Sequence, residues 1–182
     1  MKRDLSNNIE IPEEVQVSIV GNGINIKGKF GENKRKFNTQ KLEMKKEGNY
    51  IMIGAKKATK KEKKMINTIT AHIKNMIHGV KEGFEYKLKI CFSHFPITID
   101  IDKEKKQAFV KNFLGEKVPR KLNLLDGADI EINGQDIIIK SHDKEIAGQM
   151  AANFEKATRI PLKDRRIFQD GIFITSKAGE AL

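Results

Sequence analysis

The sequence has no tryptophan, a single cysteine and no long apolar run. Because no stretch of about 18 apolar residues occurs, we expect no segment that spans a bilayer. A basic protein that lies on a membrane surface would need a helix with a broad Trp, Phe and Leu face, and the missing tryptophan argues against that class. Residues 1–8 also lack the apolar core of a signal peptide. The sequence therefore predicts no contact with a membrane.

The single cysteine, Cys91, lies in a run of alternating apolar residues. One thiol forms no internal disulfide, and we expect Cys91 to be buried and reduced, which indicates the cytoplasm. The four histidines show no Cys/His spacing suited to zinc. No metal and no cofactor is expected.

Residue types of a catalytic triad occur without a usable arrangement. Ser93 and His94 are followed by Asp100, but adjacent strand residues point to opposite faces of a sheet. The glycine clusters at 21–23 and 28–31 are interpreted as tight turns, because glycine readily adopts positive φ and no Walker-type phosphate motif is present. We therefore predict that the chain is not an enzyme and has no small-molecule substrate.

Positive charge is the main surplus of the sequence. The chain has 35 Lys and Arg against 24 Asp and Glu, a formal net charge of +11. This is the usual electrostatic signature of a partner with many phosphates. Residues 1–80 hold 17 basic and 8 acidic side chains, and residues 81–182 hold 18 and 16. The second half nevertheless contains four of the six arginines, which are Arg120, Arg159, Arg165 and Arg166.

One supersecondary unit is repeated along the chain. In both halves a Gly-Glu segment is followed by an apolar strand, a Gly turn, a second apolar strand and a helix. The sequence therefore predicts an α+β protein of two duplicated domains, residues 1–82 and 83–182, each an antiparallel β-sheet unit with one packed helix. The paired segments are 30–37 with 114–122, 42–44 with 130–132, and 50–53 with 137–139.

Both helices carry end signals. Thr59 and Glu62 have the spacing of a capping box, and Gly79 offers a stop for the first helix. The second helix is predicted to begin at Asp143 and to end near Ile160, before a proline. Its expected apolar face is Ile146, Met150, Phe154 and Ala157, with a smooth flank of Gly148, Ala151 and Ala152 that suits close approach by a partner.

Four basic segments are candidate contacts. The lysine-rich stretch 56–64 fits a phosphate grip and a solvated helix face equally well, and residues 103–106 are interpreted as a charged hairpin turn. Residues 111–117 and 159–169 combine cations, amides and aromatic rings, the mixture that RNA recognition uses. We favour these last two segments as RNA contacts.

Several motifs then resemble a known family. They are Ile11-Pro12 at the opening of the first strand, Ser93 to Ile97, Asn112 to Lys117, Gly148 to Asn153, Ala157 to Ile160, and Lys163 to Gly171. In this order they resemble the universal large-subunit ribosomal protein family L-six, in its archaeal and eukaryotic form, over about residues 9–175. Where that family often has Tyr after Gly-Ile, this chain has Phe173.

The resemblance implies two duplicated domains, no catalytic activity and a structural role in the large ribosomal subunit. It implies binding of large-subunit ribosomal RNA near the sarcin–ricin stem, mainly by the second domain, with neighbouring ribosomal proteins as partners and translation factors nearby. Carried over by motif, the expected RNA-binding residues are Lys111, Asn112, Lys117, Arg120, Arg159, Lys163, Arg165, Arg166, Gln169 and Gly171.

Two other functions remain open at this stage. A free RNA chaperone or other non-ribosomal RNA-binding protein would share the same charge. An RNA-processing enzyme would need clustered carboxylates or a metal set, which the sequence lacks.

Overall fold

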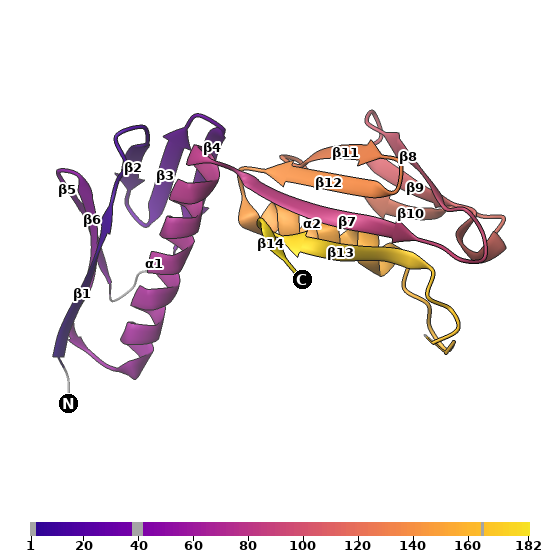
Figure 1. The fold of residues 1–182 in the computed structure, drawn as a ribbon. Coiled ribbons are helices and arrows are strands. Elements are labelled where there is room, and N and C mark those ends of the chain that lie inside the picture. The colour runs from indigo at the N-terminus through magenta and orange to yellow at the C-terminus, as the bar shows by residue number, and fades with distance from the viewer. Residues whose placement is uncertain (1–2, 38–41, 165) are drawn as a thin grey trace. The chain divides into compact units, whose positions relative to one another are not determined.

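The computed structural model describes residues 3–37, 42–164 and 166–182, which form two compact units, Met1–Gly83 and Phe84–Leu182. Each unit combines antiparallel sheets with one helix (Figure 1). The predicted α+β class with a duplicated pattern is therefore confirmed.

Unit 1 contains two three-stranded sheets and a long helix. One sheet has the order β1-β6-β5 and the other β2-β3-β4. Helix α1 contacts β1 and β6 of the first sheet and β3 and β4 of the second, so both sheets share one core. The elements are β1 (Arg3–Glu10), β2 (Gln16–Val20), β3 (Gly23–Gly28), β4 (Gly31–Lys36), β5 (Glu43–Glu47), β6 (Tyr50–Ala58) and α1 (Lys60–Lys81).

Unit 2 repeats this plan and extends it. Its three-stranded sheet has the order β10-β9-β8, and its larger sheet has the order β11-β12-β7-β13-β14. Helix α2 packs on β7, β12, β13 and β10. The elements are β7 (Phe84–Cys91), β8 (Thr98–Asp102), β9 (Gln107–Lys111), the 3-10 turn η1 (Phe113–Gly115), β10 (Arg120–Asn123), β11 (Asp129–Asn133), β12 (Asp136–Ser141), α2 (Lys144–Ala157), β13 (Gly171–Lys177) and β14 (Glu180–Ala181).

The duplication is visible in the strand pairing. In unit 1, β1 pairs with β6 and β5 with β6, while β2, β3 and β4 form a meander. In unit 2, β7 pairs with β12 and β11 with β12, while β8, β9 and β10 form the same meander. Strands β13 and β14 have no counterpart among the described residues of unit 1. Strand β13 follows the arginine-rich segment 158–170. Unit 2 therefore differs from unit 1 by this segment and by the two strands after it.

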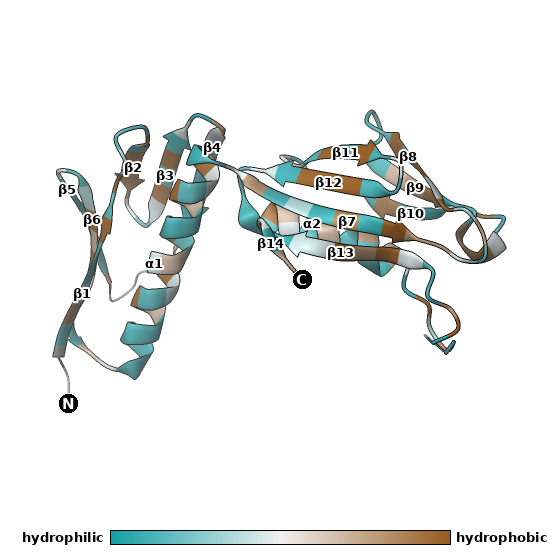
Figure 2. Cartoon of the chain, in the orientation of Figure 1, coloured by the Kyte–Doolittle hydropathy of each residue, from teal (hydrophilic) through white to brown (hydrophobic). Residues whose placement is uncertain are grey.

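The cores follow from alternating apolar residues. In β7, Phe84, Tyr86, Leu88 and Ile90 are buried while the intervening side chains are half-buried or exposed. Figure 2 shows hydrophobic bands on β7, β12 and β13, and the buried residues of these strands meet α2 in one cluster. In the described part of the chain, neither helix has the length and apolar character needed to cross a membrane.

Helix α1 begins as predicted and ends later than predicted. The Thr59 side chain accepts from the Lys61 amide at 3.3 Å, and the Glu62 carboxylate accepts from the Thr59 amide at 2.8 Å, which completes the capping box. Gly79 does not stop the helix, because it is buried within the last turn and α1 continues to Lys81. The positive φ of 77° falls on Gly83 instead.

Helix α2 is capped by Asp143, as expected, and ends at Ala157 rather than near Ile160. Its buried face is Ala147, Met150, Ala151 and Phe154, so the predicted face was rotated and Ile146 is only half-buried. The expected smooth flank mainly serves packing. Ala151 is fully buried, and a Cβ on Gly148 would lie 3.3 Å from the Tyr86 hydroxyl. Gly148 and Ala151 thus bring α2 close to β7, whereas Ala152 is only half-buried.

Two further expectations, on the start of the first strand and on Cys91, were wrong in detail. The Ile11-Pro12 pair does not open the first strand, because β1 precedes it and β2 begins at Gln16. The polar sequence of β1 gave no strand signal, but the strand pairs with β6 along most of its length. Cys91, which was expected to be buried, is half-buried and free at the end of β7. Residues 93–95 form the bend that follows β7.

Candidate nucleic-acid interface

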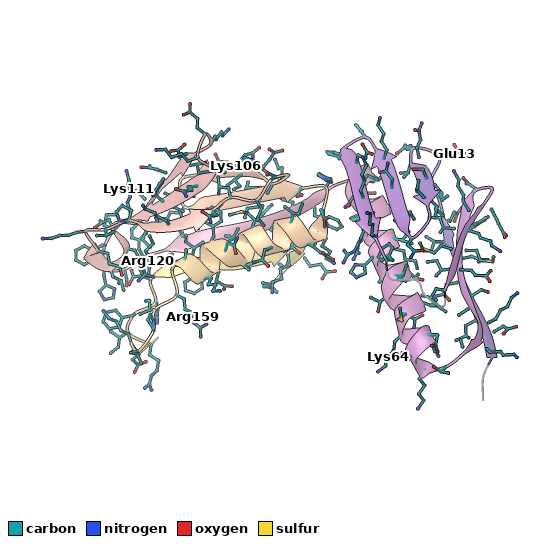
Figure 3. All side chains as sticks on the ribbon, turned by 180° about the vertical axis from the view of Figure 1, so that it is seen from behind. Glu13, Lys64, Lys106, Lys111, Arg120 and Arg159 are labelled. Atoms are coloured by element: carbon teal, nitrogen blue, oxygen red, sulfur yellow. The ribbon has the colours of Figure 1, made fainter. Side chains whose placement is uncertain are left out.

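Residues from distant segments meet at one end of unit 2, which we call the loop end. It consists of the bend at 92–97, the connection 111–120 between β9 and β10, and the segment 158–170 between α2 and β13. Figure 3 shows Lys111, Arg120 and Arg159 at this end. Most of the residues expected to bind RNA therefore come together in space.

Arg120 ties two of these segments together. Its Nε and Nη2 donate to the Glu116 carboxylate at 2.8 and 2.6 Å, and its Nη1 donates to the carbonyls of Ala157 and Arg159 at 3.0 and 3.2 Å. The guanidinium also lies 4.2 Å from the centre of the buried Phe113 ring. Its charge is thus placed at the C-terminal end of α2, where the helix dipole favours a cation. Four hydrogen bonds of the Arg120 guanidinium therefore serve the fold.

The same contact sets the charge state of Glu116. The Arg120 side chain, as hydrogen-bond donor, lowers the pKa of Glu116 against the opposing effect of burial, and Lys163 adds a further favourable charge. Since Lys163 belongs to segment 158–170, this electrostatic contact again joins the two loops.

Short-range contacts join the described residues of segment 158–170. Arg166 donates from its amide and its Nε to Asp164 Oδ1 at 2.9 and 3.2 Å, and from Nη2 to Asp164 Oδ2 at 3.0 Å. Gln169 Nε2 donates to the Arg166 carbonyl at 3.1 Å. The Arg166 side chain remains 90% exposed, so its guanidinium faces solvent although it is paired with Asp164.

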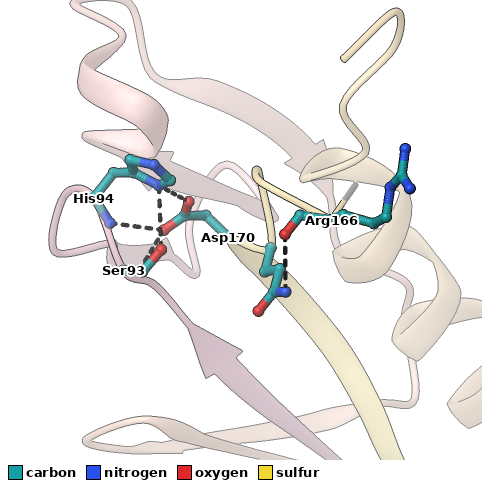
Figure 4. A network of polar contacts seen from close by, with 5 residues as sticks. Ser93, His94, Arg166 and Asp170 are labelled. Atoms are coloured by element: carbon teal, nitrogen blue, oxygen red, sulfur yellow. Dashed lines mark hydrogen bonds and ion pairs between the residues drawn. The ribbon is translucent and has the colours of Figure 1, made fainter. Parts of the chain in front are cut away.

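Asp170 anchors the end of this segment to the end of β7. Its Oδ1 accepts from the amides of Ser93 and His94 at 2.5 and 3.1 Å, and its Oδ2 meets His94 Nδ1 at 2.5 Å (Figure 4). The His94 ring stacks on Phe168 with centroids 5.5 Å apart. In Figure 4 the Arg166 side chain points away from this network. We call the Ser93, His94 and Asp170 contacts the Asp170 lock.

The electrostatics of the lock favour the carboxylate. Burial alone would raise the pKa of Asp170, but the Ser93 amide, the His94 side chain and the His94 amide together bring that pKa below its ordinary value. Asp170 is 3% exposed, so its negative charge is covered by its own donors. The expected sequence neighbour Asp100 plays no part in this network and pairs with Lys111.

The Asp170 lock contains Ser, His and Asp without the geometry of a catalytic triad. The Ser93 hydroxyl and the Asp170 carboxylate both approach the same ring nitrogen, His94 Nδ1, at 3.2 and 2.5 Å. A triad needs the acid and the nucleophile on opposite nitrogens of the imidazole. This arrangement orients a loop and transfers no proton from serine.

Some of the other residues predicted to bind RNA are exposed without a partner, and others contact residues of the protein itself. Arg159 and Lys117 are exposed, and their side chains have no hydrogen-bond or ion-pair partner among the described residues. Lys163 is exposed and lies 4.4 Å from the Phe168 ring centre. Asn112 donates to the Pro96 carbonyl at 3.0 Å, and the Lys111 ammonium pairs with Asp100. Arg165 lies outside the described residues.

Gly171 is buried, and its missing side chain leaves space for Phe173 and Thr158. A Cβ there would lie 3.1 Å from Phe173 Cζ and 3.5 Å from Thr158 Oγ1. The Thr158 hydroxyl accepts from the Ile172 amide at 2.9 Å, which attaches the end of α2 to β13. Gly171 therefore lets three elements approach one another, and its own atoms are not on the surface.

The exposed apolar residues of unit 2 also gather at the loop end. Apart from Leu182, the large apolar side chains that are exposed in the described part of unit 2 all belong to this end or to the start of β13. Leu162 is fully exposed with a φ of 61°, and Asn112 and Leu114 also have positive φ. Leu162 and Ile167 lie in the same segment as the exposed cations Lys163 and Arg166. The residues are Phe92, Phe95, Val118, Leu162, Ile167 and Phe173.

A cleft of about 730 Å³ opens between the end of α2, segment 158–170 and β13. Its lining includes the buried Ile172, the half-buried Cys91 and the exposed Lys156 and Arg159. Within the described residues no group of three or more His, Cys, Asp or Glu is placed to hold a metal ion. The full lining is Cys91, Ala152, Glu155, Lys156, Thr158, Arg159, Ile160, Phe168, Gln169, Asp170, Ile172 and Phe173.

Sequence reasoning missed His94 and Asp170 as partners, and it missed Lys156 and Phe173 as part of the same surface. His94 and Asp170 are 76 residues apart, so no local spacing connects them. The sequence offered one indication of this pairing, because His94 and Asp170 each lie in a motif that carries the family resemblance. These motifs are Ser93 to Ile97 and Lys163 to Gly171.

Comparison with known proteins gives consistent matches. The family model described as Ribosomal protein L6 matches residues 11–83 and 95–171. "Large ribosomal subunit protein uL6" of Methanobrevibacter smithii is 43% identical over 93% of this chain and 94% of that protein. The proteins of the same name from Desulfurococcus amylolyticus and Methanococcus vannielii are 42% and 40% identical, over 96% of this chain and 95% and 94% of theirs.

Proposed function

Because the chain belongs to the ribosomal protein L6 family, we propose that it binds large-subunit ribosomal RNA through the loop end of unit 2. Members of this family are structural, non-enzymatic proteins of the ribosome, so the chain is a cytoplasmic ribosomal constituent and not an enzyme. The contact is made near the sarcin–ricin stem, and it supports the region where translation factors act. Neighbouring ribosomal proteins cover other parts of the surface.

The observation that carries this proposal is the gathering of exposed cations at one end of unit 2. Arg159, Lys163 and Arg166 are exposed there, on a segment held in place by Arg120 and the Asp170 lock. Guanidinium groups match phosphate oxygens two at a time, and a fixed loop loses little entropy on binding. Residues 83–182 are therefore the rRNA-binding repeat, and the lysine-rich unit 1 adds diffuse attraction that salt weakens.

The test compares two double variants that remove the same charge. Arg159 and Arg166 are replaced by Ala in one, and Lys60 and Lys61, exposed in the first turn of α1, in the other. Affinity for a ribosomal RNA fragment with the sarcin–ricin stem is measured against salt. Removing one cation–phosphate interaction should lower the log–log slope by about 0.7 to 0.9. We expect a larger loss for the arginine pair, and the opposite order would assign RNA binding to unit 1.

A free RNA chaperone is the second candidate, since its charge requirements are the same. Co-sedimentation with large subunits after a high-salt wash separates the two. A ribosomal constituent stays with the particle, whereas a chaperone held by diffuse charge is released.

A further inference from the structure

Phe173 is an aromatic residue left open in the cleft of unit 2. It is 43% exposed although its neighbours Gly171 and Ile172 are buried. The ring is folded over Gly171, whose missing Cβ would otherwise stand 3.1 and 3.2 Å from ring atoms. Gly171 lies opposite Cys91 in the sheet, and both Cys91 and Phe173 line the cleft.

The second aromatic ring of the cleft, Phe168, already contacts two side chains of the protein. His94 stacks on it at 5.5 Å and the Lys163 ammonium lies 4.4 Å from its centre. Phe173 has no such ring or cation partner among the described residues. Of the two rings that line the cleft, only Phe173 thus offers an uncovered surface for stacking.

The charges around the cleft suit a phosphate at its rim and a neutral ring inside. Lys156 and Arg159 are exposed, and their side chains have no hydrogen-bond or ion-pair partner in the described parts of the chain. Of the two lining carboxylates, Asp170 is enclosed by Ser93 and His94, which leaves Glu155. Gln169 uses its Nε2 on the Arg166 carbonyl, so its amide oxygen remains as an acceptor. Glu155 and Gln169 can therefore accept from amino groups on the edge of a base.

We propose that this cleft binds one unstacked nucleobase of RNA, stacked on Phe173, with the adjoining phosphate held by Lys156 and Arg159. The proposal rests on the proposed function, because it names the element of the RNA that the loop end receives. The cleft volume of about 730 Å³ lies within the roughly 300–1,000 Å³ of clefts that enclose small ligands. Aromatic stacking on single-stranded bases is a general mode of RNA binding.

The absence of tryptophan from the chain supplies a direct reporter. In the variant Phe173→Trp the only indole stands in the cleft, and stacking of a base should quench its fluorescence when the sarcin–ricin fragment is added. The matched control is Phe30→Trp in unit 1, where the native ring is 56% exposed. We expect quenching at position 173 and none at position 30. No quenching at position 173, in a variant that still binds the fragment, would overturn the proposal.

The affinity of alanine variants gives the second measurement. Loss of one base–aromatic stack should weaken binding of the fragment roughly 5- to 150-fold. Phe173→Ala should show this loss and Phe30→Ala should not, with circular dichroism confirming that both remain folded. Because Cys91 is the only cysteine and lines the cleft, bound RNA should also slow its alkylation in the native protein.

The outcomes separate this proposal from the proposed function. If Phe173→Ala binds like the native protein while the Arg159 and Arg166 double variant binds weakly, RNA binding stands and the nucleobase site is refuted. If the native protein does not bind the fragment at all, the proposed function itself fails. If the indole of the Phe173→Trp variant responds to neighbouring ribosomal proteins and not to RNA, the cleft holds a peptide and the nucleobase proposal is overturned.

Discussion

Replacement of Asp170 by Asn would test whether the Asp170 lock holds the interface segment in place. The Asn side chain keeps an oxygen for the Ser93 and His94 amides, which both donate to Oδ1. At Oδ2, however, an NH₂ group replaces the carboxylate oxygen that lies 2.5 Å from His94 Nδ1. The variant therefore removes one charge-assisted hydrogen bond and changes little of the packing.

The magnitude follows from the burial of the carboxylate. A hydrogen bond to a charged group contributes about 1.5–3 kcal/mol, and the Asp170 side chain is only 1% exposed, so little solvent screening reduces this value. A loss of about 2 kcal/mol in a domain the length of unit 2 lowers the melting temperature by about 8–16 °C. The matched control is Asp164→Asn on the same segment, where the carboxylate is exposed and surface substitutions change stability little.

The pH dependence gives the prediction a second, independent readout. The pKa of Asp170 is lowered in the folded protein, so its stabilisation is complete above the unfolded pKa of about 3.9 and is lost as the pH falls through the folded value. Thermal unfolding followed by circular dichroism should therefore show the largest gap between native and Asp170→Asn protein above about pH 5. The gap should narrow in acid. Equal melting temperatures for Asp170→Asn and Asp164→Asn near pH 7 would refute the lock.

Two further predictions concern packing and charge. Arg120→Lys keeps the charge but cannot make the four hydrogen bonds to Glu116, Ala157 and Arg159, so unit 2 should lose roughly 1–3 kcal/mol of stability in chemical denaturation. The salt slope of RNA binding should stay unchanged, and a changed slope with native stability would make Arg120 a phosphate anchor. Gly28→Ala should destabilise unit 1 by roughly 1–3 kcal/mol, because its Cβ would stand 2.7 Å from the Val80 carbonyl oxygen. Gly23→Ala, with its nearest atom at 3.4 Å, is the control in thermal melts.

Local patterns predicted most of the fold. The capping box at Thr59 and the alternation in β7 depend on residues close in sequence, and each is specified by a few side chains. The duplication was predictable because the same order of strands, turn and helix occurs twice. Strand β1 was not, since its polar side chains carry no alternation and its place depends on pairing with β6.

The sequence predicted which residues belong to the candidate interface. It did not predict which of them hold the fold and which remain exposed. Sequence placed Arg120 beside Arg159 and Arg166 as equal RNA contacts, since all three are arginines in basic motifs. Only the fold shows that Arg120 reaches carbonyls 37 and 39 residues away and is committed there. Asp170 had no predicted role for the same reason, because its donors come from the end of β7.

The distinction between committed and open cations decides how the interface works. Net charge concentrates in the first half of the chain, yet diffuse lysines on a helix lose their attraction within a Debye length of about 10 Å in 0.1 M salt. The loop end instead fixes its segment with Arg120 and Asp170 and leaves Arg159, Lys163 and Arg166 exposed. Binding then requires little ordering of the protein, so the affinity of a few placed cations should exceed that of many unplaced ones.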